Sequence, residues 1–451
     1  MSKLFGSSGV RGIVSVDLTP VLTCKVASAV ATYTKAKKAV VGKDTRVSGN
    51  MIEDALVCGL QSCGVDVFLV GYVPTPVCAY ATKAYGADVG FMLTASHNPA
   101  QYNGIKVFNG NGLSLTDPQQ FAVEKVVVEN RYGLADWREL GSTTASDATA
   151  SYIKMVNDAV SLKKKWHIVV DPGCGAAFSM GPALLKSLGC KITALNAQPD
   201  GYFPARKSEP SVESLHDLSK AVAALGADIG IAFDGDADRV AFIDETGGFV
   251  NFDRSLAAYS GYVLKRSGGG IVVTNVEASM CVETMAEKYG GKVVRTRVGD
   301  IYLSEAIVNN GAVFGGEPCG AWIYPQQHLC PDGLLSAAMF LAALEDTGKT
   351  VSEFVGEVPE YTTLRENFAC KNDAKYGVVD QIGDLLKTVF SDYIEFTTVD
   401  GVRLSLKNGW LLIRASGTEP LIRLTVEGRT LAVAKDITTK ATALIHKQVE
   451  A

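Results

Sequence analysis

The sequence predicts an α/β protein with three successive mixed α/β domains of similar core and a smaller C-terminal α+β domain. Up to about residue 358, short apolar runs alternate with helical segments in three rounds, which is the pattern of parallel βαβ units. Each round ends a strand in a polar loop. The remaining residues instead hold several short strands and a long final helix. We therefore expect domains at residues 1–150, 151–250, 251–358 and 359–451.

The composition is that of a globular protein with several domains. The chain has 451 residues, of which 47% are hydrophobic, and a net charge of −5, which argues against nucleic acid as a partner. It shows neither an apolar signal core nor an apolar run of membrane-spanning length. The ten cysteines form no CxxC pair and no zinc-spaced cluster, a pattern typical of a reducing compartment. We expect a cytoplasmic monomer or homodimer without membrane contact.

The first domain begins its regular structure at Thr19-Pro20, because threonine caps a helix and proline suits its first turn. That helix should end near Lys35. Residues 5–12 are too polar for the interior of a strand, and residues 115–150 are expected to form a helix and a polar connection. The alternating elements between them are expected to be strands at 39–42, 65–70 and 89–93, with helices near 49–63 and 76–85.

The later domains are divided in the same way. In the second we expect strands at 166–170, 191–195 and 228–233, a hairpin partner at 240–243, and helices near 180–188 and 212–225. In the third we expect strands at 271–274, 292–296 and 312–314, and helices near 280–289, 301–309 and 334–345. In the last, strands at 390–396, 403–406, 410–413 and 421–426 should precede a helix over 431–448.

One strand of the first domain ends in the loop Thr94-Ala95-Ser96-His97-Asn98-Pro99. Ser96 and His97 are adjacent there, and Lys106 follows ten residues after the serine. Loops held by a rigid sheet are where α/β proteins place reactive side chains. Considered alone, the stretch is explained equally well as an ordinary polar turn closed by Asn-Pro, because serine, asparagine and proline are common turn formers.

The strand at 228–233 leads into Asp234-Gly235-Asp236-Ala237-Asp238-Arg239. Three carboxylates at alternate positions repel one another unless a cation lies among them, and oxygen ligands of this kind suit Mg²⁺. The spacing is similar to the start of an EF-hand loop, but the residues that follow are those of a strand. A solvated acidic turn is the alternative, and the apolar strand before the loop disfavours it.

Two further loops carry weaker signals. Arg414-Ala415-Ser416-Gly417-Thr418-Glu419-Pro420, with Arg423 nearby, offers the guanidinium groups, hydroxyls and glycine turn that bind a phosphate dianion. An ordinary hairpin turn explains it equally well. Gly316-Glu317-Pro318-Cys319-Gly320 holds a glutamate on a rigid turn, where it could accept hydrogen bonds from vicinal sugar hydroxyls. A plain turn is the better interpretation of that loop alone.

Together these loops resemble the motifs of the α-D-phosphohexomutases, which include phosphoglucomutases, phosphomannomutases and phosphoglucosamine mutases. Phe5-Gly6-Ser7-Ser8-Gly9-Val10-Arg11-Gly12 is similar to the N-terminal signature of that family. The loops at Ser96, Asp234, Glu317 and Arg414 are similar, in the same order, to its phosphoserine, metal, sugar and phosphate loops. The resemblance covers the whole chain, and it is to the archaeal branch of the family.

The resemblance implies four domains around a central active-site cleft and a hexose phosphate as substrate. It implies that Ser96 carries a phosphoryl group, donates it to the sugar, and takes the other phosphate back from a hexose 1,6-bisphosphate. Either His97 or Lys106 would move the hydroxyl proton, and the sequence leaves that choice open. The resemblance further implies Mg²⁺ as cofactor, held by Asp234, Asp236, Asp238 and the phosphate on Ser96, and positive charge around the transferred group from Arg11, Lys106 and Arg239.

The resemblance also assigns substrate binding: Glu317 and Cys319 would contact the sugar, and Arg414, Ser416, Gly417, Thr418 and Arg423 would hold the phosphate that is not reacting. Much of the family has serine where Cys319 stands and histidine where Ala321 stands, so Trp322 or His328 could contribute instead. We expect phosphoglucosamine mutase activity. The alternatives are a phosphoglucomutase/phosphomannomutase, a metal-dependent sugar phosphatase that uses the aspartate loop alone, and a non-catalytic sugar-phosphate-binding protein.

Overall fold

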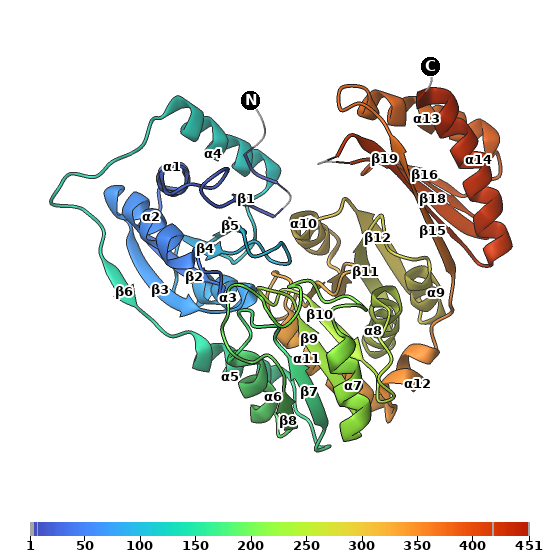
Figure 1. The fold of residues 1–451 in the computed structure, drawn as a ribbon, viewed down its shortest axis with the longest axis horizontal. Helices are drawn as coiled ribbons and strands as arrows, with labels where there is room; N and C mark the ends of the chain where they lie inside the picture. Colours follow the sequence, from blue (N-terminus) through green and yellow to red (C-terminus); the bar gives the residue numbers. More distant parts are fainter. Residues whose placement is uncertain (1–3, 7, 417–418, 450–451) are drawn as a thin grey trace. The chain divides into compact units, whose positions relative to one another are not determined.

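The computed structural model describes residues 4–6, 8–416 and 419–449. They fall into two units, each assembled from segments that are apart in the sequence (Figure 1). The strands of the described residues form four sheets, which confirms the predicted α/β class. The first unit comprises Met1–Phe252, Gly299–Val308 and Cys319–Val355, and the second comprises Asp253–Val298, Asn309–Pro318 and Gly356–Ala451.

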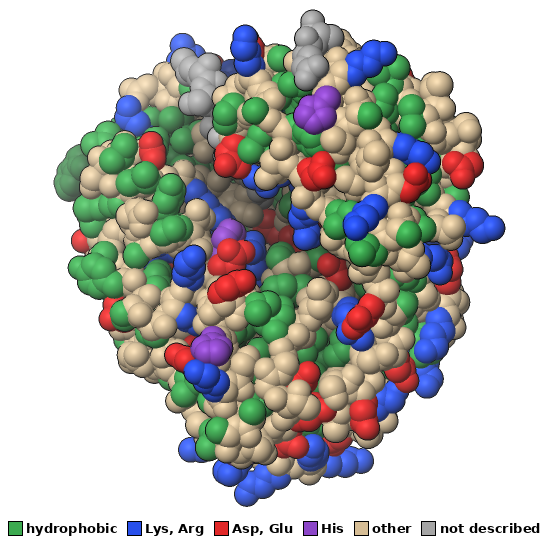
Figure 2. Space-filling model, turned by 45° about the vertical axis from the view of Figure 1, so that its right-hand side comes forward, with side chains coloured by type: hydrophobic (Ala, Val, Ile, Leu, Met, Phe, Trp, Pro, Cys, Tyr) green, Lys and Arg blue, Asp and Glu red, His purple; other side chains and the backbone are tan. Residues whose placement is uncertain are grey.

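The surface carries charges of both signs. Figure 2 shows Lys and Arg side chains interspersed with Asp and Glu side chains over one face, in keeping with the small net charge of −5. Among the helices that the structure describes, none combines the length and the apolar character needed to cross a membrane.

The first sheet positions the serine loop. Its strand order is β1-β5-β4-β2-β3-β6, with β2, β3 and β4 parallel and β5 antiparallel to both β4 and β1. Residues 5–12 were expected to lie outside strands, but Val10, Arg11 and Gly12 belong to β1. An edge strand needs a partner on one side only, so it tolerates this polar sequence. The strands are β1 Val10–Ile13, β2 Lys38–Lys43, β3 Asp66–Tyr72, β4 Val89–Leu93, β5 Tyr102–Asn109 and β6 Thr143–Ala145.

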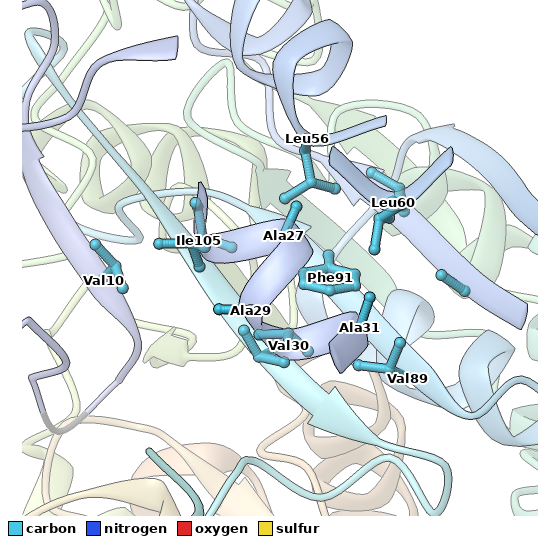
Figure 3. Packing of buried hydrophobic residues seen from close by; sticks show 14 of the residues in the cluster. Val10, Ala27, Ala29, Val30, Ala31, Leu56, Leu60, Val89, Phe91 and Ile105 are labelled. Atoms are coloured by element: carbon cyan, nitrogen blue, oxygen red, sulfur yellow. The ribbon is translucent and has the colours of Figure 1, made fainter. Parts of the chain in front are cut away.

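Helices α1 Pro20–Thr34, α2 Gly49–Ser62, α3 Thr75–Ala84 and α4 Asp117–Glu129 accompany this sheet. The Thr19 hydroxyl accepts a hydrogen bond from the backbone N–H of Leu22 at 3.2 Å, so α1 begins where the sequence predicts. Figure 3 shows Phe91 of β4 packed among Ala27 of α1 and Leu60 of α2. This fully buried core anchors β4 at the point where the serine loop begins.

The second sheet, in the order β10-β9-β7-β8, positions the aspartate loop. β9 is parallel to β7, and β10 returns antiparallel to β9, so the predicted hairpin is confirmed. The strands are β7 His167–Asp171, β8 Lys191–Ala194, β9 Ile229–Phe233 and β10 Val240–Ile243. The other elements of the first unit are α5 Thr149–Ala159, α6 Met180–Ser187, α7 His216–Leu225, most of α10 Asp300–Asn310, β14 Trp322–Ile323, α11 Gly333–Thr347 and α12 Val351–Gly356.

The second unit contains a parallel set of strands and an antiparallel sheet. The parallel set is β11 Gly270–Asn275, β12 Gly291–Thr296 and β13 Phe314–Gly316, with helices α8 Phe252–Ser267 and α9 Cys281–Lys288. The antiparallel sheet has the order β15-β19-β18-β17-β16. Figure 1 shows α13 Lys375–Val389 and α14 Leu431–Val449 side by side on one face of it. Its strands are β15 Thr362–Ala369, β16 Glu395–Thr397, β17 Val402–Leu406, β18 Gly409–Ala415 and β19 Leu421–Gly428.

The strand predicted over 390–396 is mostly wrong. Helix α13 runs to Val389, and β16 covers only Glu395–Thr397. Phe390 closes the helix with a buried ring, whereas Tyr393 and Ile394 are exposed. The apolar character that indicated a strand therefore comes from the end of a helix and from a surface connection.

Candidate active site

Ser96 lies in a tight turn after β4, against the aspartate loop. The residue is only 1% exposed, and its Oγ donates a hydrogen bond to Asp234 Oδ2 at 2.8 Å. Its φ of 49° is a left-handed conformation that costs a non-glycine residue about 1–3 kcal/mol. Because such a conformation persists only where the surroundings fix it, the contacts of this turn bear directly on its chemistry.

A buried arginine provides those contacts. The guanidinium of Arg46 donates four hydrogen bonds of 2.6–2.8 Å to backbone carbonyl oxygens between Ser96 and Tyr102. Its Nε donates to Asp44 Oδ2 at 3.0 Å, and the same carboxylate oxygen accepts from the Thr94 hydroxyl at 2.7 Å. The Thr94 oxygen in turn accepts from the backbone N–H of Ser96 at 2.8 Å. The Asp44–Arg46 pair, whose side chains are fully buried, thus fixes the shape of the serine turn.

The three aspartates converge at the start of the β9–β10 hairpin. One carboxylate oxygen each of Asp234, Asp236 and Asp238 lies within 4.8 Å of the others, and all three residues are buried. Gly235 between them has no room for a side chain, because a Cβ would lie 2.4 Å from the backbone oxygen of Ser96. The glycine therefore allows the aspartate loop to pack directly against the serine turn.

Lys106 on β5 neutralises part of this charge, since its Nζ bonds Asp236 Oδ2 at 2.7 Å and Asp238 Oδ2 at 2.5 Å. Burial opposes the ammonium charge, but the two carboxylates prevail and hold the pKa of Lys106 above its usual value. Burial alone would raise the pKa of Asp236, whereas the charge and hydrogen bond of Lys106 lower it. Burial and the two neighbouring carboxylates raise the pKa of Asp234. One lysine therefore faces three carboxyl groups and bonds two of them.

Two arginines border the aspartates. Arg11 Nη1 donates to Asn98 Oδ1 at 3.1 Å, and its buried Nε has no hydrogen-bond partner among the described residues. Arg239 donates its backbone N–H to Asp234 Oδ1 at 3.2 Å, and its Nε lies 3.9 Å from Asp238 Oδ1. Both cations are thus placed to neutralise an anion bound at this cluster.

His97 lies beside the serine, with its Nδ1 3.3 Å from Ser96 Oγ. Burial, together with the charges of Arg239 and Arg11, lowers the pKa of His97 to about 3. The imidazole is therefore neutral near pH 7, whereas Lys106 is charged. Both side chains reach the cluster that contains Ser96, so the structure keeps both as candidates for moving a proton.

The cluster fits a small divalent cation. The Oδ1 atoms of Asp236 and Asp238 are buried and have no hydrogen-bond partner within the described part of the chain, an arrangement that calls for a further ligand. The donors are all oxygen atoms, which Mg²⁺ prefers. The residues that could hold such an ion are Ser96, Asp234, Asp236 and Asp238.

The second unit contains the predicted phosphate-binding residues. Arg414 on β18 lies directly opposite Arg423 on β19, and each also pairs with carboxylates: Arg414 with Glu277 and Asp400, and Arg423 with Glu419. Ser416 is 4% exposed, and its Oγ accepts from the backbone N–H of Glu419 at 3.2 Å. A pocket is lined by Glu277, Leu412, Arg414, Ala415, Ser416, Arg423 and Thr425.

A buried lysine shapes the loop beside this pocket. Lys375, at the start of α13, donates from Nζ to the backbone oxygens of Ser416 and of Glu419, the latter at 3.0 Å. Gly417 and Thr418, which were predicted to bind phosphate, lie outside the described residues. The carbonyl oxygens of Ser416 and Glu419, like those of the serine turn, are thus held by a buried cation.

The two predicted sugar-binding residues belong to different units. Glu317 lies in the second unit, where its Oε1 accepts from Asn275 Nδ2 at 2.8 Å. Cys319 lies in the first unit and is partly exposed. Of the two, only Glu317 belongs to the same unit as the pocket lined by Arg414 and Arg423.

The structure argues against Trp322 and His328 as substitutes in sugar recognition. Trp322 is fully buried, and its ring packs near those of Phe242 and Phe340. Both ring nitrogens of His328 are engaged inside the protein: Nε2 lies 2.7 Å from Asp332 Oδ2, and Nδ1 lies 3.3 Å from the backbone nitrogen of Cys330. Neither side chain presents a free polar edge to a sugar.

Comparison with known proteins matches four family descriptions along the chain. They are the phosphoglucomutase/phosphomannomutase alpha/beta/alpha domains I, II and III and the C-terminal domain, over residues 2–133, 150–248, 251–361 and 366–443. A probable phosphoglucosamine mutase of Pyrococcus abyssi is 41% identical over 450 residues, which cover 100% of this chain and 99% of that protein. The chain belongs to the phosphoglucomutase/phosphomannomutase family.

Other members of the phosphoglucomutase/phosphomannomutase family agree with this. A probable phosphoglucosamine mutase of Methanothermobacter thermautotrophicus is 42% identical over 438 residues, 96% of each chain. The structure of a family protein from Burkholderia thailandensis superposes with a TM-score of 0.90 at 26% identity, over 99% of this chain and 97% of that one. An Aspergillus fumigatus N-acetylphosphoglucosamine mutase in complex with GlcNAc-6P and magnesium shares the fold, with a TM-score of 0.59 at 17% identity over 99% and 96% of the chains. The resemblance inferred from the motifs, including that to the archaeal branch, is confirmed.

Proposed function

We propose that this phosphohexomutase moves a phosphoryl group between the 6- and 1-positions of glucosamine phosphate through a phosphoserine at Ser96. The burial of the Ser96 hydroxyl beside the three aspartates carries this proposal. Phosphoryl transfer depends mainly on positioning and on neutralising charge. The Ser96 hydroxyl is held in a buried turn, which positions it, and Arg11, Lys106 and Arg239 beside the aspartate cluster supply positive charge.

The first half-reaction donates the phosphoryl group of Ser96 to the sugar. The bond from phosphorus to Ser96 Oγ breaks, a bond to the free C1 or C6 oxygen forms, and the hydroxyl proton of the sugar ends on Ser96 Oγ. The product is a hexose 1,6-bisphosphate. In the second half-reaction its other phosphoryl group returns to Ser96, and the proton moves back to the sugar oxygen that is released. His97 and Lys106 are the two groups that could relay this proton.

Asp234, Asp236 and Asp238 would hold Mg²⁺ next to Ser96. When bound, the ion would supply positive charge to the phosphate oxygens. The Oδ1 atoms of Asp236 and Asp238, which accept no hydrogen bond from the described residues, support this assignment. Lys106 would keep Asp236 and Asp238 in place and would favour the ionised form of Asp236. Gly235 would keep the aspartate loop against the serine turn.

The second unit would bind the parts of the substrate that do not react. Arg414, Ser416 and Arg423 would hold the unreactive phosphate, with Gly417 and Thr418 assigned by resemblance alone. Glu317 would accept hydrogen bonds from sugar hydroxyls, and Cys319 is assigned to the sugar by the same resemblance. A pocket that binds phosphate can serve both substrate orientations, because it makes few demands on the sugar.

Glucosamine is proposed as the sugar because the full-length relatives at 41% and 42% identity are named probable phosphoglucosamine mutases. The test is a comparison of kcat/KM for glucosamine, glucose and mannose 6-phosphates, each with Mg²⁺ and the matching 1,6-bisphosphate. We expect the highest value for glucosamine 6-phosphate. A higher value for glucose or mannose would overturn the choice of sugar. Release of inorganic phosphate without isomerisation would identify a phosphatase instead.

A further inference from the structure

One acidic side chain lines the phosphate pocket of the second unit. Glu277 lies just after β11, and its carboxylate forms an ion pair with Arg414. No other acidic residue is among the described residues that line this pocket. A carboxylate there repels a phosphate dianion and competes with it for Arg414. Phosphate binding alone therefore does not explain why a glutamate lines this pocket.

A buried amide fixes Glu277 relative to the proposed sugar-binding glutamate. Asn275 is 2% exposed. Its Oδ1 accepts from the backbone N–H of Glu277 at 2.9 Å, and its Nδ2 donates to Glu317 Oε1 at 2.8 Å. A continuous chain of contacts thus runs from Glu317 through Asn275 and Glu277 to Arg414. Glu277 thus links the two, through its backbone and Asn275 to Glu317, a residue suited to sugar hydroxyls, and through its carboxylate to Arg414, a residue suited to phosphate.

The same order of groups exists in one class of ligand. In a 2-amino-2-deoxyhexose 1-phosphate, the C2 ammonium lies between the phosphate on C1 and the hydroxyl on C3. A sugar whose phosphate binds Arg414 and whose C3 hydroxyl binds Glu317 turns its C2 substituent toward Glu277. We infer that Glu277 binds the C2 ammonium and so favours aminosugar phosphates over neutral hexose phosphates. This inference rests on the proposed function and adds a residue that selects the sugar.

The chain offers a matched control. Asp400 also holds Arg414, with its Oδ1 3.2 Å from Arg414 Nε and its Oδ2 2.9 Å from Nη2. Asp400 is not among the residues that line the pocket. Loss of either carboxylate frees the same guanidinium, but only loss of Glu277 removes a negative charge from the pocket wall.

The experiment measures kcat/KM for glucosamine 1-phosphate and glucose 1-phosphate, the substrates whose phosphate on C1 would bind Arg414, in the wild type, Glu277→Gln and Asp400→Asn. Glutamine keeps the size of Glu277 and a hydrogen-bond acceptor, so the substitution removes only the charge. We expect Glu277→Gln to lower the preference for glucosamine over glucose about tenfold, equivalent to about 1.4 kcal/mol. The value for glucose 1-phosphate should stay the same or rise. Asp400→Asn should leave the preference unchanged.

Two other outcomes separate the inference from the proposed function. If Glu277→Gln changes both sugars by the same factor, as Asp400→Asn does, then Glu277 serves only to orient Arg414 and the inference is overturned. If the wild type turns over glucose 6-phosphate but not glucosamine 6-phosphate, the proposed substrate is wrong, and the inference falls with it.

Discussion

Replacing Arg46 by lysine keeps a buried cation beside Asp44 but removes the guanidinium that shapes the serine turn. The side chain makes one hydrogen bond to Asp44 and four to backbone carbonyl oxygens of the turn. An ammonium group has three donor hydrogens on a single atom, so at least two of these five hydrogen bonds are lost. A hydrogen bond from a charged group contributes about 1.5–3 kcal/mol, which predicts a loss of about 3–6 kcal/mol.

The same change should impair catalysis through Ser96. The turn holds Ser96 at a φ of 49°, and without its hydrogen bonds it can relax to a less strained conformation. We expect kcat to fall about tenfold or more, which corresponds to a barrier higher by about 1.4 kcal/mol. The KM for the sugar phosphate should change little, because the pocket of the second unit that we propose binds phosphate is untouched.

Hydrogen exchange followed by mass spectrometry measures the local effect, and steady-state kinetics measures the functional one. In Arg46→Lys, exchange should rise most in residues 94–104. Arg266→Lys is the control, since this arginine is exposed on α8, and it should show wild-type exchange and kinetics. Wild-type protection of residues 94–104 together with a wild-type kcat in Arg46→Lys would refute the reasoning.

Three further predictions concern stability. Phe91→Ala, in the fully buried core of the first unit, should lower the free energy of unfolding by about 3–5 kcal/mol, whereas Phe121→Ala, at a residue 70% exposed, should change it little in urea titrations; equal losses would contradict the core assignment. Burial raises the pKa of Asp253 from 3.8 to about 6, so near pH 5 the native state binds more protons than the unfolded state. The free energy of unfolding should therefore fall by about 3 kcal/mol as the pH rises from about 4 to above 6, at about 1.4 kcal/mol per pH unit. Asp253→Asn should lack this fall, and a difference between the two proteins that does not vary with pH would contradict it. Mg²⁺ at a hundredfold excess over its Kd should stabilise the metal-free protein by about 2.7 kcal/mol in thermal scans; an equal gain in Asp236→Asn would place the ion elsewhere.

The serine turn and the aspartate loop could be located from the sequence because each follows a continuous apolar strand, β4 or β9. Polar residues directly after such a strand stand out without any tertiary information. Their mutual contact could not be located in this way. The 2.8 Å bond from Ser96 to Asp234 joins residues 138 apart in the chain, and only the resemblance to a family brought the two loops together beforehand.

The residues that support these loops carry no local signal. Arg46 and Lys375 each follow or begin an ordinary element, where a charged side chain is normally solvated. Only the folded chain brings carbonyl oxygens around them. Glu277 likewise belongs to no motif, and its proposed role follows only from its contacts with Asn275 and Arg414 in the folded chain. Helix α8 was not predicted, because Ser260 and Gly261 weaken its local helix propensity and tertiary packing decides its conformation.

The central claim is that Ser96 carries the phosphoryl group, and intact-mass spectrometry tests it most directly. The wild type and Ser96→Ala would each be incubated with glucosamine 1,6-bisphosphate and Mg²⁺, and the modified peptide would be mapped. The predicted result is one phosphoryl group on the wild type, located on Ser96, with neither the group nor mutase activity in a folded Ser96→Ala. A phosphoryl group on another residue, or full mutase activity in Ser96→Ala, would contradict the claim.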